Sequence, residues 1–188
     1  MLLVMAGVYA FVRGRPRPAG ALPTLAAGAK ASAGLVVPYL VLGSRRRAAL
    51  IGVLGAGLAL LVMGLAGFGT DVFHALGLLS SNQGRSSRLS FPYLVSELVG
   101  NRSVVRVLFG IAFACVAGWT LWRTWRGADP IRMAAWATVA ILVATAWLVP
   151  WYLLWLLPLA ALAADRRLTL AAVALSAWVL AIGVPGIY

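Results

Sequence analysis

The feature that most constrains this chain is a set of long runs without any charged residue. The longest covers 32 residues, Met133–Ala164, and the next covers 21, Ala48–Phe68. Two shorter runs, Val107–Trp122 and Leu168–Val184, cover 16 and 17 residues. A helix needs about 20 apolar residues to cross a bilayer. The runs therefore predict membrane-spanning helices, and the longest run is too long for one crossing.

Composition argues against a soluble fold. Of the 188 residues, 63% are hydrophobic and 11% are charged, whereas soluble domains average roughly 45–50% apolar and 25% charged residues. A soluble chain of this length has too little interior to bury so much apolar surface. We therefore expect an all-α fold, a polytopic transmembrane helix bundle that forms a single domain over residues 1–188. Its solvent would be the lipid bilayer of the cell membrane.

The formal net charge of +12 raises the question of nucleic acid. The basic residues form short clusters between apolar runs and not one continuous face, as the positive-inside rule produces in cytoplasmic loops. We therefore expect no nucleic-acid partner. The clusters are Arg13/Arg15/Arg17, Arg45–Arg47, Arg85/Arg88/Arg102/Arg106, Arg123/Arg126/Arg132 and Arg166/Arg167.

The distribution of these clusters favours two short helical hairpins. If every apolar block crossed once, nine basic residues would lie on one side and six on the other. If residues 18–44 and 133–164 fold back instead, eleven lie on one side and five on the other. The tips would be Lys30 and Pro150–Tyr152. Each arm is short for a span, so the tips should lie inside the protein, where non-helical backbone must be buried or line a cavity.

Residues 69–103 form the one long polar stretch, and the same topology predicts that they are an extracytoplasmic loop. Ser80–Gly84 is rich in turn-forming residues. Phe91 begins a more ordered stretch that could form a short amphipathic helix.

Lys30 is the most informative single residue, because an ammonium in an apolar segment costs about 2.5–3.5 kcal/mol on insertion scales. It could face a cavity and bind an anion, or it could extend toward an interface. Asp129 and Asp165 are predicted on the cytoplasmic side, so a ligand phosphate is the better candidate partner. The predicted extracytoplasmic loop, residues 69–103, offers Arg85 and Arg88, whose planar guanidinium groups suit phosphate.

Asn82 and Gln83 could hydrogen-bond sugar hydroxyls, although a solvated basic loop explains the same residues. The chain has one histidine, His74, and one cysteine, Cys115, so a metal site made of these residue types is not expected. We find no motif of a soluble enzyme and expect no cofactor.

Three segments resemble one family. Leu25–Leu40, which contains Lys30 and Pro38 and is followed by Arg45–Arg47, resembles the apolar–Lys–apolar–Pro–apolar–basic signature of GT-C membrane glycosyltransferases. Ser81–Gln83 is similar to the Asn-Gln element of glycosyltransferase family 87. Val149–Leu162 is similar to the Pro-Trp-Tyr-x-x-Trp-x-x-Pro block of that family and of the related actinobacterial polyprenol-phosphomannose-dependent mannosyltransferases.

The resemblance implies transfer of a sugar, expected to be mannose, from a polyprenyl-phosphate donor to an extracytoplasmic glycan or lipid acceptor. It implies that Lys30 neutralises the donor phosphate and that Arg85 or Arg88 assists the leaving group. Asn82, Gln83 and His74 would bind substrate. Trp151 and Tyr152 would line the entry of the lipid carrier.

The resemblance covers only the C-terminal half of such enzymes. Their acidic catalytic residue lies in an outer loop upstream of the matched segments, so no catalytic residue is assigned and activity of the chain alone stays open. We expect a C-terminal fragment of a larger protein. The alternative is a small non-catalytic multi-pass membrane protein, such as a transporter subunit or scaffold.

Overall fold

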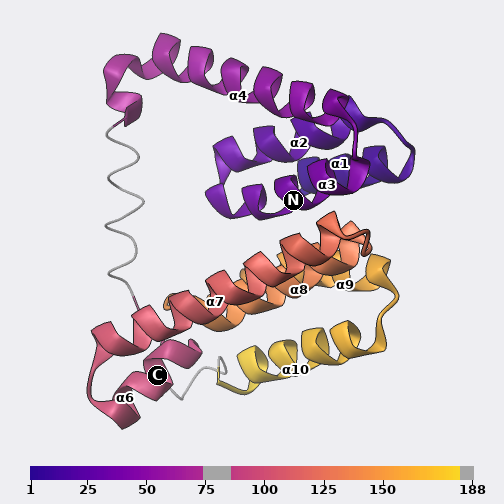
Figure 1. Ribbon diagram of the computed structural model, residues 1–188. Helices are drawn as coiled ribbons and strands as arrows, with labels where there is room; N and C mark the ends of the chain where they lie inside the picture. Colours follow the sequence, from indigo (N-terminus) through magenta and orange to yellow (C-terminus); the bar gives the residue numbers. More distant parts are fainter. Residues whose placement is uncertain (74–85, 183–188) are drawn as a thin grey trace. The chain divides into compact units, whose positions relative to one another are not determined.

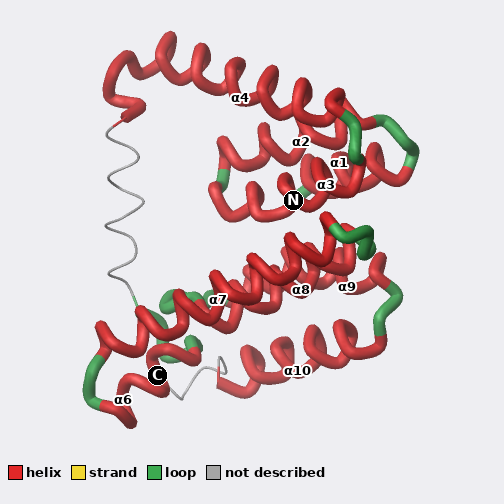
Figure 2. Tube along the Cα trace, in the orientation of Figure 1, coloured by secondary structure: helices red, strands yellow, loops and turns green. Residues whose placement is uncertain are grey.

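The computed structural model describes residues 1–73 and 86–182, and every regular element in those ranges is a helix (Figures 1 and 2). The expected all-α class is confirmed. The α-helices are α1 (Leu2–Val12), α2 (Pro16–Ala29), α3 (Val37–Ser44), α4 (Arg47–Phe68), α6 (Phe91–Val99), α7 (Arg102–Trp125), α8 (Pro130–Ala144), α9 (Leu153–Ala163) and α10 (Arg166–Ile182). Short 3₁₀ helices are η1 (Ala31–Val36), η2 (Gly69–Phe73) and η4 (Pro150–Tyr152).

The described residues form two compact units. Unit 1 lies within Met1–Ser80 and Leu121–Ala134, and unit 2 lies within Ser81–Thr120 and Ala135–Tyr188. The boundary between them falls inside α7 and α8.

Unit 1 is built around α2, which packs against α1, α3 and α4. Glycines allow α2 and α4 to approach backbone to backbone. A methyl group on Gly20 would overlap the carbonyl of Ala49, and one on Gly52 would overlap the carbonyl of Arg17. Small residues at helix contacts are typical of membrane proteins, where close van der Waals packing replaces the hydrophobic effect.

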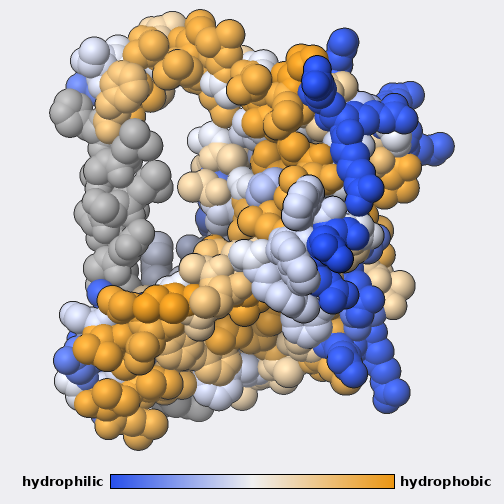
Figure 3. Space-filling view, viewed as in Figure 1, coloured by the Kyte–Doolittle hydropathy of each residue, from blue (hydrophilic) through white to orange (hydrophobic). Residues whose placement is uncertain are grey.

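Helix α4 packs through some of its small residues and exposes many of its large apolar residues. Ala49 and Ala56 are buried, while Leu54 is 70% exposed. Much of the surface over α4 is hydrophobic (Figure 3). Within the described residues, α4 with η2 and α7 are the two helical segments long and apolar enough to cross a membrane. The larger number of crossings expected from the sequence stays a prediction.

Three turns that carry arginines meet at one end of unit 1. They are the α1–α2, α3–α4 and α7–α8 turns. A methyl group on Gly43 would contact the Phe11 ring and the Pro130 ring, and the Arg45 guanidinium donates a hydrogen bond to the Trp125 carbonyl at 3.3 Å. Three of the four clusters predicted to share a side are therefore neighbours. The nine arginines are Arg13, Arg15, Arg17, Arg45, Arg46, Arg47, Arg123, Arg126 and Arg132.

Unit 2 contains α6, α9 and α10 together with parts of α7 and α8. Helices α9 and α10 pack against each other, and each has buried residues about every three or four positions. These residues are Leu153, Leu156, Leu159 and Ala160 on α9, and Leu168, Ala172, Leu175 and Val179 on α10.

Both predicted hairpin blocks contain a helix break at the expected place. The first block breaks at Lys30, whose backbone is extended at φ −153° between α2 and η1, and α2 packs on α3. The second block breaks between Ala144 and Leu153, around the Pro150–Tyr152 turn. The helix predicted to begin at Phe91 is also present, as α6.

Candidate functional site

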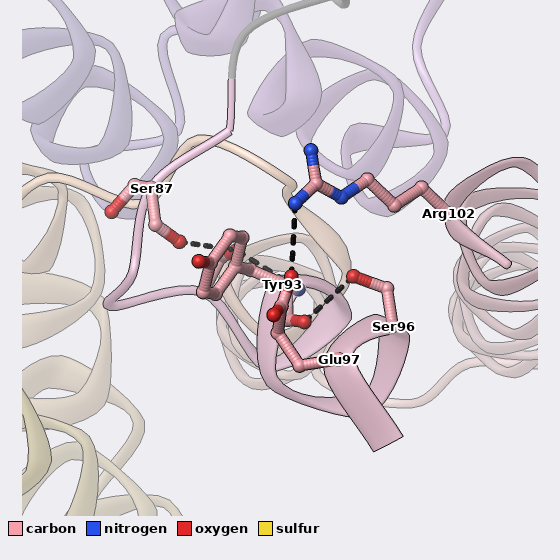
Figure 4. A network of polar contacts seen from close by, with 6 residues as sticks. Ser87, Tyr93, Ser96, Glu97 and Arg102 are labelled. Carbon is pink, nitrogen blue, oxygen red and sulfur yellow. Dashed lines mark hydrogen bonds and ion pairs between the residues drawn. The ribbon is translucent and has the colours of Figure 1, made fainter. Parts of the chain in front are cut away.

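A polar cluster forms in unit 2 where α6 leads into α7 (Figure 4). Ser90 begins α6: its hydroxyl accepts a hydrogen bond from the Tyr93 amide at 3.2 Å and donates one to the Ser87 carbonyl at 2.8 Å. This is an ordinary helix N-cap, which satisfies an otherwise unpaired amide. Ser90 is fully buried, so the segment that precedes α6 is fixed to the helix and not merely adjacent to it.

A short connection places the start of α7 next to α6. Gly100 ends α6 with a left-handed backbone at φ +75°, a conformation that glycine adopts without steric cost. The Asn101 side chain then accepts a hydrogen bond from the Val104 amide at 3.0 Å and caps α7. Because the turn is so tight, the first side chain of α7 reaches back over α6.

That side chain is Arg102. Its guanidinium bonds the Glu97 carboxylate at 2.9 Å and lies 5.6 Å from the centre of the Tyr93 ring. The two charged side chains are 60% and 51% exposed, and exposed ion pairs contribute little to stability because water screens them. The pair therefore adds little stability, and it places the Arg102 guanidinium beside Glu97 and Tyr93.

Arg102 and Arg106 are four residues apart on α7 and so share one helix face. Both line a small hollow of about 10 Å³, which has room for about one water molecule. Its lining is Ser86, Pro92, Tyr93, Ser96, Arg102, Arg106 and Ala146. With Glu97 included, the ionic side chains carry a formal charge of +1. Guanidinium groups beside hydroxyls favour anions, but the hollow is too small to enclose a phosphate, which would have to contact the two arginines from outside it.

The helix break in unit 2 is joined to this cluster through Ser87. The Ser87 amide donates to the Ala146 carbonyl at 2.9 Å, and its hydroxyl donates to the Leu148 carbonyl at 2.7 Å. Backbone carbonyls outside a helix need such partners when water is excluded. The break therefore obtains hydrogen bonds from the protein. Its tip, Pro150–Tyr152, contains no buried residue, so the prediction that this tip lies inside the protein is wrong.

Helix α10 holds the same segment from another direction. The Trp178 indole donates a hydrogen bond to the Leu89 carbonyl at 2.9 Å. Its ring stacks on Phe91, with centroids 4.9 Å apart. Residues 86–90 are consequently tied both to the break and to α10.

Three of the predicted site residues lie in this part of unit 2. Arg88 is exposed in the turn before α6. In η4, Trp151 is 56% exposed, and Tyr152 stacks on Trp155 with ring centroids 4.2 Å apart. The bonds of Ser87 bring the segment that carries Arg88 next to the break that leads into η4. The structure thus relates these three residues, although their roles in binding stay predictions.

Lys30 lies in unit 1, at an exposed position. The prediction that this tip lies inside the protein is therefore wrong. Lys30 is part of the described break between α2 and η1. It does not line the hollow beside Arg102, and it does not line the hollow in unit 1 that is described below. The other predicted site residues, His74, Asn82, Gln83 and Arg85, lie outside the described residues.

Sequence reasoning missed the roles of Arg102, Arg106 and Ser87. The two arginines were grouped with the charges of the loop, although their spacing of four at the start of an apolar run places them on one helix face. Nothing near Ser87 indicates that it bonds residues about 60 positions away. Over residues 1–73 and 86–182, no three histidine, cysteine, aspartate or glutamate side chains gather in a way that could hold a metal ion.

Comparison with known proteins gives one match. The family model described as the MptB C-terminal domain matches residues 99–186. The matched segment is just under half of the chain, begins at the end of α6 and includes α7 to α10. It suggests a C-terminal region like that of an MptB-type mannosyltransferase. No curated protein and no solved structure matches the chain. The narrower resemblance to glycosyltransferase family 87 stays a prediction.

Proposed function

We propose that this chain is the C-terminal part of a membrane glycosyltransferase. It would help to move a sugar, mannose in our proposal, from a polyprenyl-phosphate donor to a glycan or lipid acceptor outside the cell. The observation that carries the proposal is the match of residues 99–186 to the MptB C-terminal domain. An MptB-like domain implies a lipid-linked sugar donor and a glycan acceptor in a membrane setting.

The unit 2 cluster supports a role in holding the donor phosphate. Arg102 and Arg106 share one helix face at the start of α7, which is a helix apolar enough to cross a membrane. Guanidinium groups at the end of such a helix lie at the depth of lipid head groups. We assign Arg106 and Arg102 to this task together with Arg88, and we retain Arg85 as a predicted member.

Lys30 and the aromatic residues of η4 complete the proposal. Lys30 would neutralise the donor phosphate, while Trp151 and Tyr152 would contact the prenyl chain. Asn82, Gln83 and His74 would bind sugar hydroxyls from the extracytoplasmic loop 69–103. The supports for these roles are the helix breaks at Lys30 and before η4, which are where the family resemblance puts the donor.

The alternative is a non-catalytic multi-pass membrane protein, such as a scaffold or transporter subunit. The exposed apolar surfaces of α4 and α7 fit both functions. The match of residues 99–186 to the MptB C-terminal domain favours the donor-binding function, because a scaffold or transporter subunit does not account for it.

A measurement of donor binding distinguishes the glycosyltransferase from the non-catalytic membrane protein. The full chain, in nanodiscs of phosphatidylcholine, is titrated with a polyprenyl-phosphate mannose and, separately, with the uncharged polyprenol. We expect clear preference for the phosphate, and about tenfold weaker binding in Arg106→Gln or Lys30→Ala, since each removes a charged contact worth roughly 1.5–3 kcal/mol. Arg167→Gln, which removes an exposed arginine of α10, is the control. Equal binding of donor and polyprenol would overturn the proposal. Mannose transfer to an added acceptor then tests the enzymatic step.

A further inference from the structure

The arginine-bearing end of unit 1 contains a second hollow, unrelated to the polar cluster of unit 2. Its volume is about 220 Å³, below the roughly 300 Å³ at which pockets for drug-sized ligands begin. It therefore suits a small group. The hollow is lined by Phe11, Gly14, Pro16, Gly43, Ser44 and Arg46.

The charge around this hollow is strongly one-sided. The three turns that meet here contribute nine arginines and a single acid, Asp129, a formal surplus of +8. Asp129 already accepts a hydrogen bond from the Arg132 amide at the start of α8. A positive concavity of this kind attracts anions over distances longer than a hydrogen bond.

The local partners of the arginines show which one serves the hollow. The Arg13 guanidinium donates a hydrogen bond to the Tyr9 hydroxyl at 3.0 Å, and the Arg45 guanidinium donates one to the Trp125 carbonyl. Both side chains therefore already have hydrogen-bond partners within the protein. Arg46 lines the hollow itself. The Ser44 hydroxyl donates to the Val41 carbonyl, which makes Arg46 the main donor to an occupant.

The walls indicate what kind of anion fits. Phe11 and Pro16 give the hollow an apolar side, and next to Phe11 on α1 the side chains of Tyr9 and Val12 are 60% and 65% exposed. An anion with attached hydrocarbon could place its charge against Arg46 and its chain along α1. Arg47 at this end begins the candidate span of α4, so the hollow lies at head-group depth if α4 crosses the membrane.

We propose that this hollow binds the head group of an anionic phospholipid of the leaflet on the arginine side. The phosphodiester contacts Arg46, the remaining arginines hold the lipid by longer-range attraction, and an acyl chain lies along α1. The inference depends on the proposed membrane insertion but not on sugar transfer.

The test is lipid retention by the purified full chain. The protein is stripped of lipid in a neutral detergent, then offered phosphatidylglycerol or phosphatidylcholine, and bound lipid is counted by native mass spectrometry. We expect one retained phosphatidylglycerol and about tenfold weaker binding in Arg46→Gln, because a charge-assisted contact is lost. Arg46→Lys, which keeps the charge, should lose less, and Arg167→Gln, an equal charge change on α10, should lose almost nothing.

Three results would overturn the proposal. Equal retention of the two lipids would show that charge recognition is absent. Equal losses in Arg46→Gln and Arg167→Gln would reduce the effect to net charge. Displacement of the lipid by millimolar inorganic phosphate would assign the hollow to a free anion. No sugar donor is present in this experiment, so its outcome is independent of the donor-binding test.

Discussion

Units 1 and 2 each contain a broken helix, but the two breaks are stabilised in different ways. In unit 1 the break is one extended residue, Lys30, whose amide bonds the Ala26 carbonyl and whose carbonyl accepts from the Ala33 amide, both at 2.9 Å. In unit 2 the break covers residues 145–149, and the bonds to Ala146 and Leu148 come from Ser87. One break is closed by its neighbours in sequence, and the other is held in part by a distant segment.

The surroundings of the breaks differ in the same sense. The helices of unit 1 are held by close backbone packing at glycines, which needs no polar side chain. Part of unit 2 depends on a few hydrogen bonds that converge on residues 86–90. We therefore expect unit 1 to be sensitive to added volume and unit 2 to be sensitive to lost hydrogen bonds.

The largest effect is expected from added volume in unit 1. Gly52→Ala places a methyl group against the Arg17 carbonyl, and the two helices must separate. We expect a loss of about 3 kcal/mol in the free energy of unfolding, at the upper end for overpacking. Tryptophan fluorescence during a titration from mild detergent into sodium dodecyl sulfate measures it. Gly55→Ala is the matched control, because a methyl group there meets no atom within 4 Å. Equal losses in both variants would contradict packing through Gly52.

Ser87→Ala tests the polar tie of unit 2. It removes the bond to the Leu148 carbonyl and should cost about 2 kcal/mol, since a partly buried acceptor loses its partner. Amide hydrogen exchange over residues 146–153 should accelerate, while exchange in unit 1 stays unchanged. Ser86→Ala, one residue away at an exposed position, should change neither the free energy of unfolding nor the hydrogen exchange over residues 146–153. Unchanged exchange in Ser87→Ala would show that the break is held by other contacts.

A smaller effect is expected from Trp178→Phe. The change removes the indole bond to the Leu89 carbonyl but leaves a ring to stack on Phe91, so about 1 kcal/mol should be lost. Trp151→Phe, at a residue more than half exposed, provides a comparison with almost no expected change. If both variants unfold at the same denaturant concentration, the tie from α10 contributes nothing measurable.

The smallest effect concerns Arg45, which ends α3 with a left-handed backbone at φ +49°. Arg45→Gly relieves backbone strain of about 1 kcal/mol but loses the hydrogen bond to Trp125, so the net change should be close to zero. Arg45→Ala keeps the strain, loses the bond and should be less stable than Arg45→Gly by about 1 kcal/mol. The reverse order of the two variants would show that strain at Arg45 is absent.

Local sequence signals located most of the helices and both breaks. Charge-free runs indicated α4 and α7, and Lys30 and Pro150 marked where two blocks are interrupted. The end of α8 could not be located in this way. It stops at Ala144, before Pro150, and the carbonyls of the break that follows accept hydrogen bonds from Ser87.

The candidate site was less predictable than the fold. Arg88, Trp151 and Tyr152 were singled out individually, and the contacts that relate their segments pass through Ser87 and Trp178, residues with no distinguishing local pattern. The spacing of Arg102 and Arg106 at the start of an apolar run indicated a helical pair, but their contact with Glu97, Tyr93 and Ser86 had no signal in the sequence. Spatial proximity of segments far apart in the chain is the information that a single sequence lacks.

Helix α4 reverses the usual arrangement of a soluble helix, with Ala49, Gly52 and Ala56 toward its neighbours and leucines such as Leu54 and Leu58 toward the surroundings. Evolution should therefore treat its two faces in opposite ways. Positions such as Leu54 and Leu58 should vary among apolar residues but should not become charged. Ala49 and Gly52 should stay small residues across species. A comparison of related sequences along α4 would thus indicate which of its faces contacts lipid.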